Sequence, residues 1–165
     1  MNSNINNKVV FQDLGTKDYM PTWDYQEELL KKNLDIKVAN RAIEDTTKHQ
    51  TTENHLLFVE HPHVYTLGKS GHEDNMLANA DKLKEIEATY VKVNRGGDIT
   101  YHGFGQIVGY PVLDLENFYT DIHRYMRDLE EVIIKTIAEY GLKGERSPGE
   151  TGVWLDVGKP YARKI

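Results

Sequence analysis

The stretch RGGDITYHGFGQ, residues 95–106, concentrates residue types that can build a ligand pocket: four glycines, one arginine and one histidine within twelve positions. Glycine allows a backbone to approach a ligand closely and to adopt positive φ. The backbone N–H groups of such turns can bind anionic or carbonyl oxygen. The stretch therefore predicts a polar pocket, and the residue types alone do not name its ligand.

Two kinds of nucleotide-binding loop do not fit this stretch. A Walker A loop needs a lysine and a hydroxyl residue after its last glycine, but Gly105 is followed by Gln106 and Ile107. A dinucleotide-binding fingerprint needs its glycines to open a helix, whereas the flanking apolar residues alternate as in a strand. Arg95 then stands as a structural or anion-pairing residue. His102 is either a hydrogen-bonded residue that fixes the loop or a catalytic one.

A metal site is a further alternative, because His61 and His63 stand close together in EHPHV and His102 could join them. Pro62 between the first two histidines makes a strained chelate, and no acidic ligand is evidently paired with them. We therefore expect no metal site.

The elements around this stretch follow from the spacing of apolar residues. Thr89–Gly97 alternates at period two and predicts a strand that delivers the glycines, so residues 95–106 should connect two strands. A long amphipathic helix is expected from Tyr19 to about Thr47, and a second over Thr120–Tyr140 that ends at Gly141. The stripe of the first helix consists of Trp23, Leu30, Leu34, Val38 and Ala42.

Other runs complete the expected fold. Pro111 indicates a bulge or an edge position in its strand. The mixture of strands with two long helices predicts an α/β (α+β) domain, a mixed sheet with helices packed on one face. The further strands are Val9–Gly15, Leu56–Pro62, Val64–Gly71, Gln106–Leu115 and Thr151–Val157, with a weaker helical stretch at Asn75–Ala88.

The composition predicts one acidic, soluble domain. A length of 165 residues suits a single domain spanning residues 1–165. The formal net charge of −6 argues against nucleic acid, and a mean hydropathy of −0.62 without a long apolar run argues against a membrane span. The start MNSNINNK lacks the features of a secretory signal, so we expect a cytoplasmic protein. The chain has no cysteine, which excludes disulfides and a nucleophilic thiol from these residues.

The sequence closely resembles one enzyme family. RGGDITYHGFGQIVGYPVLDL is similar to the signature R-G-G-x-x-T-[YFW]-H-G-P-G-Q-x-V-x-Y-P of the lipoyl(octanoyl) transferases. LLFVEHPHVYTLGKSG resembles that family's upstream L-x-x-x-E-H-P-x-V-Y-T-x-G, and TGVWL followed by RKI takes the place of its G-V-W…K-I segment. The resemblance implies the biotin/lipoate protein ligase-like fold, also described as class II aminoacyl-tRNA synthetase/biotin synthetase-like.

The resemblance also implies a function. Such enzymes transfer an octanoyl group from octanoyl-acyl-carrier protein to a specific lysine of lipoyl domains through a cysteine acyl-thioester, the first step of protein lipoylation. The expected acceptors are the lipoyl domains of 2-oxoacid dehydrogenase complexes and the glycine cleavage H protein, and no cofactor is expected. A neighbouring ammonium stabilises a thiolate nucleophile, which is the role that the family's lysine has.

Family roles can be carried over where residues match. Lys164 matches the catalytic lysine, while Lys159 is a competing candidate in a Gly-Lys-Pro turn that more often is simply solvated. Thr100 and His102 would shape the acyl pocket. The matched substrate-binding residues are Arg95, Gly96, Gly97, Asp98, Ile99, Thr100, Tyr101 and His102.

The chain departs from the family pattern in two places. Phe104 replaces the usual proline and removes its fixed φ. The family's nucleophilic cysteine lies in a Pro-Cys-Gly segment downstream of the lysine, and this chain ends one residue after Lys164. We therefore expect an N-terminal portion of the enzyme, incomplete at its C-terminus and inactive by itself.

Two other functions remain open from the sequence. An ATP-dependent lipoate or biotin protein ligase on the same fold would show S-G-G-G-x-x-Y-H-D, with a carboxylate directly after the histidine. His102 is followed by Gly103, which favours the transferase. The other alternative is a non-catalytic fragment that binds acyl-carrier protein or lipoyl domains, which the missing cysteine supports.

Overall fold

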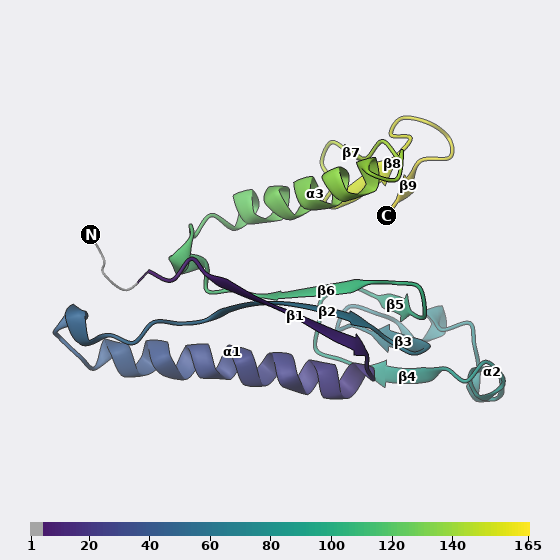
Figure 1. Ribbon diagram of the computed structural model, residues 1–165. Helices are drawn as coiled ribbons and strands as arrows, with labels where there is room; N and C mark the ends of the chain where they lie inside the picture. Colours follow the sequence, from purple (N-terminus) through teal and green to yellow (C-terminus); the bar gives the residue numbers. More distant parts are fainter. Residues whose placement is uncertain (1–4) are drawn as a thin grey trace. The chain divides into compact units, whose positions relative to one another are not determined.

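The computed structural model describes residues 5–165 and divides the chain into two compact units, Met1–Phe118 and Tyr119–Ile165. Each unit is described by itself below (Figure 1). None of the helices within residues 5–165 combines the length and the apolar character that a membrane crossing requires.

The first unit contains two mixed sheets in its described part. One has the strand order β1-β2-β6, in which β1 is parallel and β6 antiparallel to β2. The other has the order β4-β3-β5, in which β4 is parallel and β5 antiparallel to β3. The strands are β1 (Val9–Thr16), β2 (Asn54–Glu60), β3 (Val64–Leu67), β4 (Thr89–Lys92), β5 (Ile99–His102) and β6 (Val108–Val112).

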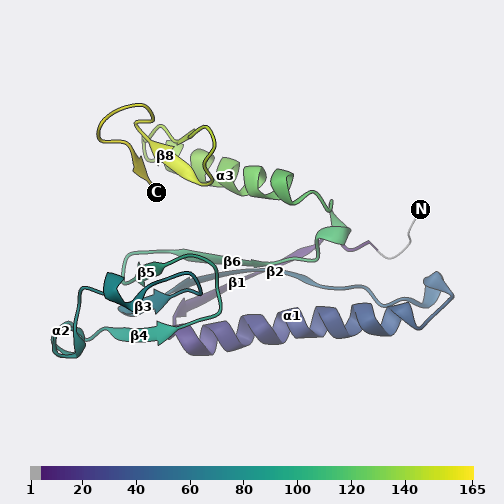
Figure 2. The same cartoon turned by 180° about the vertical axis from the view of Figure 1, so that it is seen from behind.

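A long crossover helix, α1 (Tyr19–Arg41), joins the parallel strands β1 and β2, as such a pair requires. Figure 1 and Figure 2 show β1, β2 and β6 running beside this helix. Both views place β3, β4, β5 and the short α2 (Ala80–Glu85) together near its N-terminal end. The sheet of β3, β4 and β5 therefore lies near the start of α1.

The predicted stripe of α1 was wrong. The buried residues of the helix are Tyr19, Thr22, Leu29 and Asn33, whereas Leu34 of the expected stripe is 52% exposed. The polar residues Thr22 and Asn33 can be buried because their side chains are hydrogen-bonded. Thr22 Oγ1 donates to Asp18 O, and Asn33 exchanges two hydrogen bonds with the backbone of Glu53, at 2.7 and 2.9 Å. The spacing of apolar residues cannot predict that Thr22 and Asn33 are buried.

Two other boundaries also differ from expectation. The first helix ends at Arg41, and Asp45 then caps a short 3₁₀ turn, Thr46–Lys48, through the Thr47 N–H. The stretch 95–106 is more than a connection, because Ile99–His102 within it forms β5 and pairs with β3. Pro111 lies on the edge strand β6 opposite Leu56, in an unbroken register, so it marks an edge and not a bulge.

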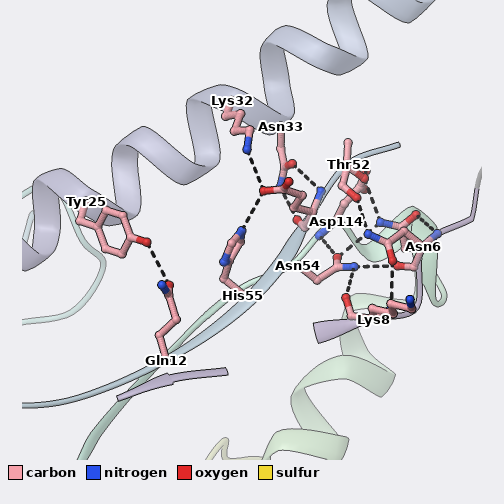
Figure 3. Close-up of polar contacts among 12 residues, drawn as sticks. Asn6, Lys8, Gln12, Tyr25, Lys32, Asn33, Thr52, Asn54, His55 and Asp114 are labelled. Carbon is pink, nitrogen blue, oxygen red and sulfur yellow. Dashed lines mark hydrogen bonds and ion pairs between the residues drawn. The ribbon is translucent and has the colours of Figure 1, made fainter. Parts of the chain in front are cut away.

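A polar network fixes the start of β2 to the segments around it (Figure 3). Asn54 is fully buried, and its Nδ2 donates to Asn6 O at 2.7 Å and to Lys8 O at 3.2 Å. Its Oδ1 accepts the Asp114 N–H at 3.0 Å. Because every polar atom of this side chain has a partner, hydrogen bonds offset the cost of burying it, and the asparagine holds three segments together.

The second unit packs a helix against a small antiparallel sheet of order β7-β8-β9. Asp121 caps the helix by accepting the Arg124 N–H, and Gly141 follows its C-terminus with a φ of +76°, as predicted. The elements are α3 (Ile122–Ala138), β7 (Glu145–Arg146), β8 (Val153–Leu155) and β9 (Arg163–Lys164). Helices with mixed sheets confirm the predicted fold class.

Candidate functional site

Arg95 follows β4 and folds back onto β3. Its Nη2 donates to Thr66 O at 2.7 Å, to Thr66 Oγ1 at 2.8 Å and to Asp98 O at 2.9 Å, and its Nε donates to Thr66 Oγ1 at 3.2 Å. A guanidinium presents its donors in a rigid planar fork, so these bonds fix the turn that follows it. Arg95 therefore positions the glycine-rich turn, the structural role that the sequence left open.

Gly68 lies where the end of β3 passes directly under this turn. Its N–H donates to Asp98 O at 3.1 Å, and the Lys69 N–H donates to Arg95 O at 2.9 Å. A Cβ at position 68 would lie 2.3 Å from Gly97 O, closer than real Cβ contacts allow. Gly97 has a φ of +83°, which favours glycine. The role of Gly68 was not predicted from the sequence, although a glycine directly follows the alternating VYTL run.

The strand β5 divides the carried-over residues between two faces of its sheet. Successive side chains of a strand point to opposite faces, so Ile99 and Tyr101 share one face while Thr100 and His102 share the other. The register places Thr100 opposite Thr66 on β3. The side chains of the matched segment therefore do not all face the same pocket.

The face of His102 meets a buried cluster of aromatic rings. His102 stacks on Tyr19 with ring centroids 5.8 Å apart and lies edge-on to His61 at 5.7 Å. His61 also contacts the rings of Tyr19, at 5.2 Å, and Tyr110, at 6.0 Å. Four segments thus converge here: the start of α1, the turn after β2, β5 and β6.

Hydrogen bonds fix the tautomer of His61, whose side chain is 0% exposed. Its Nδ1 lies 2.7 Å from Lys17 O and its Nε2 lies 3.0 Å from the Tyr110 hydroxyl. A carbonyl oxygen only accepts, so Nδ1 carries the proton, and Nε2 accepts the Tyr110 O–H. Burial lowers the pKa of His61, which keeps the ring neutral.

The two tyrosine hydroxyls of this face also stay protonated near neutral pH. Burial raises the pKa of the Tyr110 hydroxyl well above its ordinary value. Burial likewise raises the pKa of Tyr19, which the nearby Arg95 only partly offsets. His102 Nδ1 lies 2.7 Å from Gln106 Oε1, so it donates to that amide oxygen. The face thus offers flat aromatic rings and two neutral hydroxyl groups, with the Arg95 guanidinium beside Tyr19.

The opposite face of β5 borders a hollow. It has a volume of about 410 Å³ and lies between the sheet and the segment around α2. Next to it, the Tyr101 hydroxyl and His63 Nδ1 are hydrogen-bonded at 2.5 Å, so His61 and His63 have separate partners. No group of three histidine, cysteine, aspartate or glutamate residues within residues 5–165 is placed to hold a metal ion. The hollow is lined by Tyr65, Met76, Leu77, Ile86, Ile99 and Tyr101, among others.

Lys164 belongs to the second unit, where it lies on β9 opposite Trp154 of β8. Its Nζ is 5.8 Å from the centroid of the indole ring, within the range of a cation–π contact. The competing Lys159 lies in an exposed turn in which its N–H donates to Asp156 O at 3.0 Å. Both lysines are exposed, and Lys164 is the one that lies on a strand with an aromatic ring near its Nζ.

Comparison with known proteins identifies the family. The model of the lipoyl protein ligase A/B catalytic domain matches residues 18–165. The chain is 63% identical over 161 residues to an octanoyltransferase of Christiangramia forsetii and 62% identical over 161 residues to one of Flavobacterium psychrophilum. In both cases the match covers 98% of this chain and 68% of the relative. An octanoyltransferase of Cytophaga hutchinsonii is 48% identical over 166 residues, with 100% of this chain and 68% of that relative covered.

Solved structures share the fold. LipL1 of P. falciparum, in complex with lipoate, matches 90% of this chain and 41% of its own with a TM-score of 0.60 at 13% identity. The bipartite lipoate protein ligase of Thermoplasma acidophilum matches 98% of this chain and 54% of its own, with a TM-score of 0.53 at 17% identity. The lipoate ligase-like fold expected from the sequence is thus confirmed. With these relatives, the chain belongs to the lipoyl protein ligase A/B catalytic domain family and is an octanoyltransferase family member.

Proposed function

We propose that this protein transfers an octanoyl group from octanoyl-acyl-carrier protein to a specific lysine of lipoyl domains, through a cysteine acyl-thioester. The observation that carries the proposal is 63% identity over 161 residues to a protein named octanoyltransferase. The intact RGGDITYH segment supports it further.

The proposed reaction has two acyl transfers. A cysteine thiolate attacks the thioester carbonyl of the octanoyl-carrier protein, and the carrier's thiolate leaves, so that the acyl group becomes a thioester on the enzyme. The amine of the target lysine then attacks that thioester and forms an amide, and the proton that the amine loses passes to the departing sulfur, which restores the enzyme's thiol. These 165 residues contain no cysteine, so the thiol of this scheme lies outside them, and the 165 residues alone are inactive.

The residues present would bind and prepare the substrate. The segment from Arg95 to His102 would hold the acyl donor, with Gly96, Gly97 and Asp98 in the turn that Arg95 fixes. Thr100 and His102 would shape the acyl pocket with the neutral rings behind them, while Ile99 and Tyr101 would support the segment from its other face. Lys164 would lower the pKa of the thiol and take up its proton, because an ammonium stabilises a nearby thiolate.

The partners and setting follow from the same proposal. The acceptors would be lipoyl domains of 2-oxoacid dehydrogenase complexes and the glycine cleavage H protein, with no cofactor, in the cytoplasm. Residues 1–165 would act as one catalytic domain.

Two observations favour a second candidate, an ATP-dependent ligase. The family model covers both ligase A and ligase B, and the similar solved structures are lipoate protein ligases. Intact-mass spectrometry of an apo lipoyl domain separates the two. The full-length protein is incubated either with octanoyl-carrier protein without ATP or with free octanoate, ATP and Mg²⁺.

We expect octanoylation of the lipoyl domain only from the carrier-bound donor. Modification only from octanoate with ATP would instead establish the ligase. No modification from either donor, with binding of the carrier protein, would indicate the non-catalytic alternative.

A further inference from the structure

We propose that Glu130 is a positioning residue that sets the place of the Lys164 side chain through the backbone of Gly152. The inference rests on the proposed function, which gives Lys164 its role in tuning the thiol. All three residues lie in the second unit, on α3, before β8 and on β9.

Glu130 is a buried carboxylate at the centre of this unit, with 4% of its surface exposed. Its Oε2 accepts Arg127 Nη1 at 2.7 Å and Arg146 Nε at 3.1 Å. Its Oε1 accepts the Gly152 N–H at 2.8 Å. Burial alone would raise the pKa of this carboxyl, but the Gly152 N–H and the two guanidinium groups hold the pKa below its usual value. The side chain is therefore ionised, and α3 is fastened to the backbone at position 152.

Gly152 provides the space through which the lysine side chain runs. A Cβ at this position would lie 2.4 Å from Lys164 Cε and 3.2 Å from Lys164 Nζ. The residue also has a φ of +95°, which favours glycine. The end of the lysine side chain thus crosses Gly152 in van der Waals contact, between that backbone and the ring of Trp154.

The rest of the sheet holds the lysine backbone in register. Lys164 pairs with Trp154, and the Ile165 N–H donates to Val153 O at 2.9 Å. Because the backbone on both sides is fixed, the position of Nζ depends on the surface beneath the side chain. That surface is the Gly152 backbone, which Glu130 holds.

A methyl group at position 152 should move the lysine and not unfold the protein, since Cε and Nζ are the far end of a flexible side chain. Gly149 is the matched control. It has a φ of +78°, and a Cβ there would meet nothing within 4 Å in the described part of the chain. Gly149→Ala therefore carries a similar backbone strain without displacing Lys164.

The test is the pH dependence of kcat/KM for octanoyl transfer by the full-length protein. Its acidic limb reports the pKa of the nucleophile in the free enzyme. With the ammonium displaced, Gly152→Ala should move that limb upward by about 1 pH unit, while Gly149→Ala leaves it in place. Glu130→Ala should move it in the same direction, and Glu130→Gln, which keeps an acceptor for the Gly152 N–H, should restore most of the wild-type profile.

The outcomes separate this inference from the function on which it rests. Wild-type transfer rates in Lys164→Met would overturn the role of the lysine itself. If Lys164→Met loses transfer but Gly152→Ala and Gly149→Ala give the same acidic limb, Lys164 acts and its proposed positioning is wrong. Should Glu130→Ala fail to fold, the glycine pair decides alone.

Discussion

His61 illustrates at the residue scale how position changes the meaning of a side chain. In the sequence it stands beside Pro62 and His63 and suggests a metal ligand. In the fold its two ring nitrogens are occupied by Lys17 O and the Tyr110 hydroxyl. A ring with both nitrogens hydrogen-bonded and no exposed surface acts as a fixed, neutral part of the cluster of aromatic rings beside His102.

The lowered pKa of His61 predicts a pH-dependent stability. The unfolded chain, with an ordinary histidine pKa of about 6.5, binds a proton more readily than the folded one, so acidification favours unfolding. The stabilisation is complete above the unfolded pKa and is lost as pH falls through the depressed folded pKa. Urea unfolding between pH 7.5 and 5 should give a smaller pH slope for His61→Gln than for wild type, with His72→Gln, at an exposed histidine, unchanged from wild type. Equal slopes for wild type and His61→Gln would contradict the assignment.

The contact at Gly68 predicts a second residue-scale effect. Gly68→Ala should lower the free energy of unfolding by about 1–3 kcal/mol, because the neighbour of the new methyl group is the Gly97 carbonyl, a backbone atom that cannot turn away. Gly96→Ala is the control, since a Cβ there would meet nothing within 4 Å in the described residues, and should change stability by less than about 1 kcal/mol. Chemical denaturation of the two variants measures the difference, and a Gly68→Ala protein as stable as wild type would disprove the close approach.

At the element scale, alternation in the sequence located β3, β4 and β8, because the side chains of a strand point alternately to opposite faces. A continuous apolar run located β2. Alternation failed where other features dominate. Glycines on both sides of Ile99–His102 made that strand look like a connection. The face of α1 was misread because Thr22 and Asn33 are buried through hydrogen bonds, which a hydrophobic pattern cannot count.

The corrected face of α1 gives a direct prediction. Leu29 is 8% exposed, and Leu29→Ala should lower the free energy of unfolding by about 2–4 kcal/mol through lost burial and a residual cavity. Leu34, on the same helix but half exposed, should lose less than about 1 kcal/mol in Leu34→Ala. If urea denaturation shows a larger loss of stability for Leu34→Ala than for Leu29→Ala, the buried face is the one that the sequence suggested.

At the scale of the whole molecule, the family could be read from the sequence, since two glycine- and histidine-containing motifs occur in the expected order. The residues that contact each site residue could not be predicted from the sequence. Tyr19, His61 and Tyr110 come from segments far apart in the chain, and only the packing of α1, β2 and β6 brings them to His102. Likewise, nothing in the spacing of Glu130, Gly152 and Lys164 indicates that they touch.

The most direct test of the proposed acyl transfer is the intact mass of the full-length protein after incubation with octanoyl-carrier protein alone, without acceptor and without ATP. We predict one octanoyl adduct, removed by neutral hydroxylamine as a thioester is, and no adduct on the 165 residues by themselves. A full-length protein that stays unmodified under these conditions, or an adduct on the 165-residue chain, would contradict the proposed cysteine thioester route.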